Sequence, residues 1–108
     1  MRSFASLRRR ADFARLRQRG RRVSSKTFTI YITDALAGDP TSLVGITVNK
    51  SIGKAVARNK LRRRLAAIVN EALARSGAVR LLVVARPAAA GIGYPALHAE
   101  FVSAFARA

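Results

Sequence analysis

The segment from residue 54 to residue 75 places the strongest constraint on the fold. Apolar residues recur there at intervals of three and four, namely Ala57, Leu61, Leu65, Ile68, Ala72 and Leu73. This spacing predicts a long amphipathic helix with one buried stripe. At 3.6 residues per turn, Asn59, Arg63 and Asn70 fall on the side opposite Leu61. Gly77 is expected to end the helix, whose apolar stripe must pack against the rest of the chain.

Three shorter segments have the patterns of strands. Residues 27–33 alternate, so that Phe28 and Ile30 share one face while Thr29 and Tyr31 share the other. Residues 43–48 form a second strand, which is expected to pair with the first as a hairpin through turn-forming residues 34–42. Residues 81–85 are continuously apolar, which is typical of a strand buried on both faces. Residues 23–26 are compatible with a further short strand.

Two additional helices are predicted, at 11–19 and 94–107. Phe13 and Leu16 give the first an apolar side, and Gly20 is expected to stop it; Pro95 suits the first turn of the second. The 108 residues are expected to form one domain, 1–108, in which 1–10 is a basic N-terminal arm. An Arg-rich, acid-free start also fits an organellar transit segment, but the basic arm is the preferred interpretation. No apolar run approaches the roughly 18–20 residues that span a bilayer.

Charge indicates the class of partner. Lysine and arginine total 21 against 5 acidic residues, giving a net charge of +16. Ten of these basic residues lie within 1–26 and seven within 50–64. Such an excess favours a polyanionic partner, and nucleic acid is the leading candidate because phosphate contacts release counterions. An anionic membrane surface is the weaker alternative, because the basic stretches are poor in large apolar anchors.

The composition argues against catalysis by this chain alone. There is no cysteine, His98 is the single histidine, and the acidic residues are scattered. Thiolate zinc sites, cysteine nucleophiles and disulfides are therefore excluded, and His98 is expected to be a bystander. The glycines Gly91 and Gly93 lack the Lys-Ser/Thr of a phosphate-binding P-loop. No catalytic or metal-ligating residue is expected.

The basic run within the long helix has two interpretations. From Lys54 to Leu65 the sequence is KAVARNKLRRRL, with six basic residues and no acid before Glu71. A solvated helix face would be the ordinary explanation, but salt-bridged surface helices mix both signs of charge. An unneutralised cluster that contains an asparagine suits contacts to phosphate and sugar, which we therefore favour.

This segment also resembles a known family. The run Arg58-Asn59-Lys60-Leu61-Arg62-Arg63, preceded by Ile52-Gly53-Lys54-Ala55-Val56, resembles the RNR motif of the bacterial ribonuclease P protein subunit. Nearly the whole chain shares the likeness: Asp12-Phe13 in the first helix, residues 28–31 and 44–48 in two strands, and residues 83–86 in the strand after the motif. The order and spacing of these pieces are more specific than any one of them.

The resemblance implies a fold and a function. The fold is an α/β (α+β) two-layer sandwich in the order α-β-β-β-α-β-α, with a small mixed sheet and a left-handed βαβ crossover. The function is 5′ maturation of precursor tRNA, an endoribonuclease reaction of the holoenzyme in which the RNA subunit is the catalyst and holds the Mg²⁺. The partners are the ribonuclease P RNA and precursor tRNA, and the protein is expected to be cytoplasmic and monomeric in a 1:1 complex with the RNA.

The resemblance also assigns residues. The RNase P RNA would be bound by positions matching the basic loop and the motif, which are Lys50, Lys54, Arg58, Asn59, Lys60, Arg62 and Arg63. The single-stranded leader would lie in a cleft formed by Phe13, Arg17, Thr29 and Tyr31. Family members often carry an aromatic residue at the position of Arg17 and an aliphatic one at Thr29. The preference for leader sequence is thereby left open.

Two other classes compete with this one. A ribosomal or other structural RNA-binding protein would show no dependence on precursor tRNA. A DNA-binding or architectural protein would normally present a recognition helix with mixed polar side chains, rather than six basic residues around one asparagine.

Overall fold

The computed structural model describes residues 3–108. In chain order its elements are β1 (Ala5–Ser6), α1 (Arg10–Arg19), β2 (Arg21–Ser24), β3 (Phe28–Asp34), β4 (Leu43–Thr47), a 3-10 turn (Lys50–Ile52), α2 (Ala55–Leu73), β5 (Val79–Ala85), a second 3-10 turn (Pro87–Ala89) and α3 (Tyr94–Arg107). The helices begin and end within about two residues of the positions that the periodicity predicts.

The strands form one mixed sheet in the order β1-β4-β5-β3-β2. β4 is parallel to β1 and β5, whereas β3 is antiparallel to both β5 and β2. The predicted hairpin between residues 27–33 and 43–48 is therefore wrong, because β5 lies between those two strands. The reason is burial: Leu81, Leu82 and Val83 are completely enclosed, and a strand that is apolar on both faces is most favourable at the centre of a sheet.

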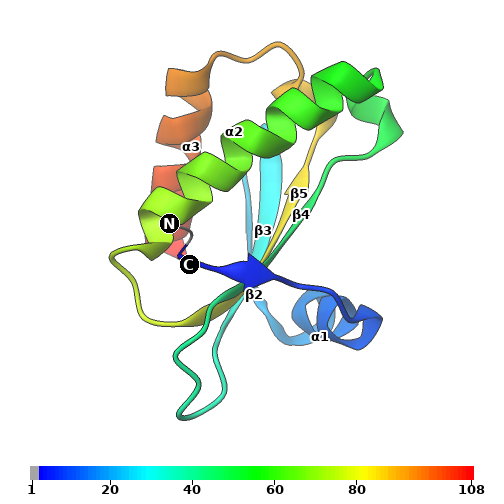
Figure 1. Ribbon diagram of the computed structural model, residues 1–108. Coiled ribbons are helices and arrows are strands. Elements are labelled where there is room, and N and C mark those ends of the chain that lie inside the picture. The colour runs from blue at the N-terminus through cyan, green and yellow to red at the C-terminus, as the bar shows by residue number, and fades with distance from the viewer. Residues whose placement is uncertain (1–2) are drawn as a thin grey trace.

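The connection from β4 through α2 to β5 is a left-handed crossover. Figure 1 shows both strands running upward, with β5 to the left of β4 and α2 crossing in front of the sheet. Nearly all such connections are right-handed, so this exception confirms an expectation that the family resemblance supplied.

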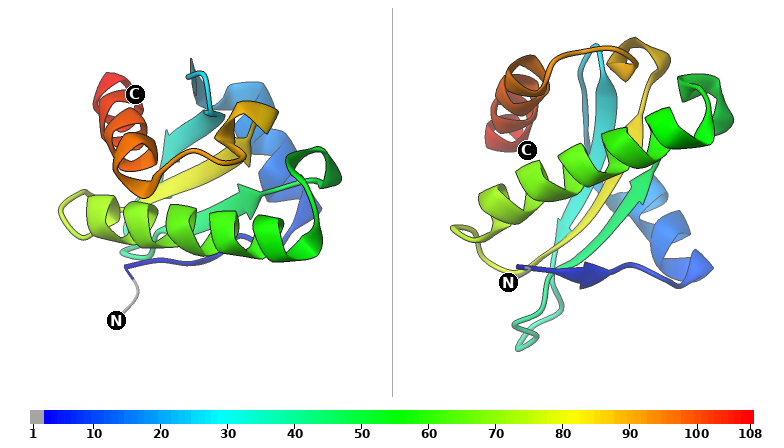
Figure 2. Two further views of the ribbon diagram at one scale, coloured as in Figure 1. Left: turned by 90° about the horizontal axis from the view of Figure 1, so that it is seen from above. Right: turned by 45° about the horizontal axis from the view of Figure 1, so that its top comes forward.

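The main core lies between the sheet and the pair α2 and α3. Leu65 and Ile68 from α2, Leu97 and Phe101 from α3, and Phe28 on the inner face of β3 are buried together in it. α1 covers part of the opposite face of the sheet, as the view from above shows (Figure 2). There Leu7, Leu16 and Leu82 form a second, smaller cluster. The predicted two-layer sandwich is confirmed, and α1 adds a partial third layer.

The segment expected to be a basic arm also supplies the edge strand of the sheet. Ala5 pairs with Leu43, and the Leu7 amide donates to the carbonyl of Val44 at 2.9 Å. The Leu7 side chain is buried under α1. Residues 1–2 of the arm lie outside the described part of the chain. Within residues 3–108, no helix has the length and apolar character needed to cross a bilayer.

Candidate nucleic-acid interface

The basic loop and α2 are arranged by a cap and a glycine. The Asn49 side chain accepts a hydrogen bond from the Ser51 amide at 3.1 Å, which begins the 3-10 turn. Gly53 then takes a φ of +144°, a conformation that side chains disfavour. As a result, Lys50 and Lys54 both lie exposed at the N-terminal end of α2.

The motif residues lie outside the buried stripe of α2. Leu61 and Leu65 face the core, while Asn59, Lys60, Arg62 and Arg63 are exposed. The Asn59 side-chain oxygen accepts a hydrogen bond from Nη1 of Arg62 at 2.9 Å. This contact one helical turn apart orients the Arg62 guanidinium and leaves its other donors for a ligand.

Arg58 differs from its neighbours in the motif. It is half-buried, and its Nε is enclosed without an acceptor anywhere in residues 3–108. A buried donor without a partner is costly, and an RNA oxygen could pair with this Nε only after the Arg58 side chain moved to expose it.

Arg64 is a residue whose role the sequence did not reveal. Its Nη1 donates to the carbonyl of Ile92 at 3.3 Å and so ties α2 to the loop before α3. Lys60 and Arg64 line a hollow of about 420 Å³ against residues 89–93. In the sequence Arg64 is simply part of a basic run, and its structural contact depends on a segment 28 residues away.

On the opposite face of the sheet, α1 brings two of the predicted cleft residues together. The guanidinium carbon of Arg17 lies 5.8 Å from the centre of the Tyr31 ring, within the range of a cation–π contact. Thr29, two residues before Tyr31 on the same face, is 7% exposed, and its hydroxyl lies 3.4 Å from that of Ser24. Because Thr29 is almost fully buried, its side chain supports this surface from below and offers little area for direct contact with a ligand.

Phe13 packs against the sheet at a glycine. A Cβ added to Gly45 would lie 2.8 Å from Cε1 of Phe13, so the ring rests directly on the Gly45 backbone. Phe13 is half-buried beside Leu16 and Leu82. The residue therefore anchors α1 to the sheet and still presents part of its ring.

The structure adds Arg22 to the residues around Tyr31. Arg22 is directly opposite Tyr31 in the β2–β3 ladder, so the two side chains share a face. Arg22 is exposed. Sequence periodicity could not find it, because the assignment depends on which strand pairs with β3 and in which register.

The two predicted surfaces meet at the side of the sheet where β1 and β4 lie. A hollow of about 250 Å³ there is lined by Phe13 from α1, Gly45 from β4 and Arg62 from α2. The motif face and the α1 face are therefore neighbours around one edge. Lys50 and Lys54 lie two turns or more before Arg62, toward the other end of this surface.

Almost none of this positive charge is neutralised internally. Among the described residues, Arg80 forms an ion pair with Asp39 at 2.6 Å, and His98 lies 3.4 Å from the Glu71 carboxylate. The Thr41 amide and the Arg80 guanidinium both donate to the Asp39 carboxylate, which lowers its pKa. Residues 3–108 hold no cluster of three His, Cys, Asp or Glu side chains that fits a metal ion. The geometry thus offers cations, amides and a few rings, which is the chemistry of nucleic-acid contact.

These features define a class: small basic α+β proteins whose unpaired cations form a surface suited to nucleic acid. A family model described as Ribonuclease P matches residues 1–108. The ribonuclease P protein component of Acidothermus cellulolyticus is 41% identical over 96 residues, 88% of this chain and 80% of that protein. That of Thermobifida fusca is 37% identical over 105 residues, 91% of this chain and 71% of that protein.

Solved structures agree with the sequence relatives. A Staphylococcus aureus RNase P protein mutant with defective mRNA degradation activity matches with a TM-score of 0.83 and 25% identity, covering 92% of this chain and 83% of that one. The RNase P protein from Thermotoga maritima has the same fold, with a TM-score of 0.77 at 22% identity over 91% of this chain and 92% of that one. The chain belongs to the ribonuclease P protein family.

Proposed function

We propose that this chain is the RNA-binding protein component of ribonuclease P and assists the catalytic RNA in removing the 5′ leader from precursor tRNA. The observation that carries the proposal is the unneutralised surface that runs from the motif side of α2, around the side of the sheet formed by β1 and β4, to the α1 face. Membership of the family supports the ribonuclease P role.

The motif face is assigned to the RNase P RNA. Its exposed cations have no acid within 4.0 Å among the described residues, and Asn59 holds Arg62 in place. Arginine donates bidentately to phosphate, and asparagine both donates and accepts. The residues given this role are Lys50, Lys54, Arg58, Asn59, Lys60, Arg62 and Arg63.

The α1 face is assigned to the single-stranded leader, through Phe13, Arg17, Thr29 and Tyr31. Because Arg17 lies over the Tyr31 ring, an incoming base either stacks on the outer face of the guanidinium or displaces it from the ring. Guanidinium planes and aromatic rings both stack on unpaired bases. The nearby Arg22 adds a phosphate contact, so this cleft depends more on charge than one with a second aromatic residue.

Bond breaking is assigned to the RNA subunit. Residues 3–108 hold no group of three His, Cys, Asp or Glu side chains that could bind a metal ion, so no step of the proposal passes through a metal held by this chain. The RNA would supply the Mg²⁺ site for phosphodiester hydrolysis. The protein would act as a monomer in a 1:1 complex with that RNA, in the cytoplasm.

Reconstitution tests the proposal. The purified chain is combined with an RNase P RNA and a 5′-labelled precursor tRNA at a low Mg²⁺ concentration, where the RNA alone is slow. The chain should accelerate release of the leader, and the chain without RNA should release none. An RNA-binding protein of another class would bind both RNAs without accelerating cleavage. That result, or cleavage by RNA-free protein that survives removal of contaminating nuclease, would contradict the proposal.

A further inference from the structure

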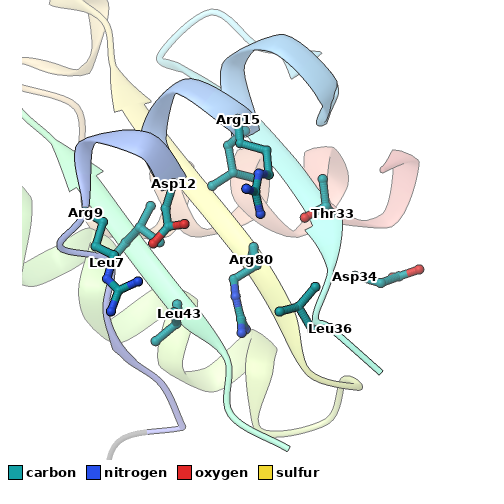
Figure 3. Close-up of a pocket in the computed structure, with 10 residues that line it drawn as sticks. Leu7, Arg9, Asp12, Arg15, Thr33, Asp34, Leu36, Leu43 and Arg80 are labelled. Atoms are coloured by element: carbon teal, nitrogen blue, oxygen red, sulfur yellow. The ribbon is translucent and has the colours of Figure 1, made fainter. Parts of the chain in front are cut away.

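A second concave site lies on the other flank of α1, away from Tyr31. It has a volume of about 350 Å³ and is lined by residues from α1 and the segment before it, from the end of β3 and the loop after it, and from the starts of β4 and β5. Figure 3 shows the lining side chains around this hollow. Its charged residues include Arg9, Asp12, Arg15 and Arg80, and its apolar residues include Leu7 and Leu36.

The β3–β5 register separates this site from the proposed leader cleft. Tyr31 is paired with Leu82, whereas Thr33 is paired with Arg80. Two residues along a strand correspond to about 6.6 Å, with side chains on the same face. Because Arg17 reaches toward Tyr31 while Asp12 and Arg15 line the hollow, α1 lies between the hollow and the Arg17–Tyr31 contact.

The charged groups of the site differ in how firmly they are held. Arg80 donates to the Asp39 carboxylate at 2.6 Å and to the Thr41 carbonyl at 2.7 Å, and its side chain is 16% exposed. Arg9 and Arg15 are exposed, and within residues 3–108 neither has an ion-pair partner. The Arg80 guanidinium is therefore held in place by the protein, whereas those of Arg9 and Arg15 remain available to a ligand.

The apolar part of the lining consists of leucine side chains. Leu7 and Leu16 are buried between α1 and the sheet, and Leu36 stands at the rim with 69% of its surface exposed. A volume of this size is at the lower end of the range for small-molecule sites, which are mainly apolar with a few polar groups that fix orientation. A planar ring lying on these leucines would cover Leu36 and bury apolar surface.

We propose that this hollow binds one unpaired ribonucleotide. The base lies on the leucines, its phosphate contacts Arg9 and Arg15, and the Asp12 carboxylate accepts a hydrogen bond from an exocyclic amino group. A carboxylate is the natural acceptor for such a group, so cytosine is preferred to uracil. The inference rests on the proposed function, because the nucleotide would belong either to the precursor tRNA leader or to the RNase P RNA.

The first experiment uses the free chain and separate nucleotides. CMP and UMP are titrated into ¹⁵N-labelled protein, and amide shifts are followed by NMR. Shifts are expected at Thr33, Leu36 and Leu43, larger with CMP, and they should be lost in an Arg9→Ala/Arg15→Ala variant. The matched control is Arg8→Ala/Arg19→Ala, which removes the same charge from exposed positions outside the hollow. Absence of shifts at the hollow, or equal loss in both variants, would overturn the proposal.

The second experiment identifies the source of the nucleotide in the holoenzyme. Precursor tRNAs with progressively longer leaders are compared, alongside the affinity for RNase P RNA. Losing a charge-assisted contact should lower the binding affinity of the Arg9→Ala/Arg15→Ala variant about tenfold relative to the control variant. The loss should appear either only with precursor tRNAs that have long leaders or only with the RNase P RNA. The first pattern identifies the leader, and the second identifies the RNA subunit. If wild-type cleavage is normal and both variants behave alike, the nucleotide site is refuted while the proposed function stands.

Discussion

Replacing Gly45 by alanine should loosen α1 from the sheet. The new Cβ would lie 2.8 Å from Cε1 and 3.0 Å from Cζ of Phe13, and 3.3 Å from Cδ1 of Leu82. Carbon atoms in contact prefer separations of about 3.5–4.0 Å. The Phe13 ring must therefore move by at least several tenths of an ångström. Leu82 is completely buried in the centre of the sheet, so the movement falls on Phe13 and on the helix that carries it.

The expected magnitude follows from this overlap. Insertion of a methyl group into a packed contact typically costs about 1–3 kcal/mol. Each kcal/mol of lost stability lowers the melting temperature of a domain of this size by roughly 4 °C or more. Gly77→Ala is the matched control, because its Cβ would have no atom within 4 Å and its backbone is not in the left-handed region. That variant should be neutral or slightly stabilising.

Thermal and urea unfolding of four proteins would test the contact itself. These are the wild type, Gly45→Ala, Phe13→Ala and the double variant, with free energies of unfolding compared as a cycle. Removing the Phe13 ring makes room for the methyl group, so Gly45→Ala should cost almost nothing in the Phe13→Ala background. Full additivity of the two changes would refute the contact as the source of the effect.

Three further perturbations have defined outcomes. Arg58→Ala/Arg62→Ala/Arg63→Ala should weaken binding to the RNase P RNA and lower the magnitude of the slope of log affinity against log salt concentration by about two to three units. The melting temperature of the free protein should stay normal, and an unchanged slope would show that the cluster is only a solvated helix face. Tyr31→Ala should cost on the order of 1–3 kcal/mol in binding free energy for a precursor tRNA with a leader of several nucleotides, and almost nothing for a leader of one nucleotide. Equal losses with both substrates would show that Tyr31 does not contact the leader. The hydrogen bond from Thr41 and the contact with Arg80 lower the Asp39 pKa in the folded state, so the stability that they contribute is present above the unfolded pKa and is lost as pH falls through the folded pKa. Between about pH 5 and 2, the melting temperature of the wild type should therefore fall more than that of Asp39→Asn. Identical pH profiles of the two proteins would contradict this.

The sequence predicted the elements whose patterns are local. The Leu61–Leu65–Ile68 stripe identified α2, and alternation correctly placed Phe28 and Tyr31 on opposite faces of β3. Both results depend on the fixed periods of a helix and a strand, which any short window displays. The exposed side of α2 followed from the same stripe, since residues off the apolar side of a packed helix face solvent.

The pairing of the strands could not be predicted from local sequence patterns. The chain order of β3 and β4 suggested a hairpin, but β5 separates them and pairs with both. Residues 5–6 gave no strand pattern, yet they extend the edge of the sheet beside β4. Pairing depends on which strand gains most from burial on both faces, and on a crossover through α2, so a local window carries no information about it.

Some residues of the candidate sites could likewise be predicted from the sequence, and others only from the tertiary structure. The basic residues of α2 could be named from the sequence because they share one helix, and the resemblance to a family supplied the residues of the leader cleft. The position of Arg22 beside Tyr31, the contact of Phe13 with Gly45, and the hollow that joins Arg15 to Arg80 were decided by tertiary structure. Each of them brings together side chains from different elements, and their distances are set by strand order, register and the packing of α1, which are properties of the whole chain.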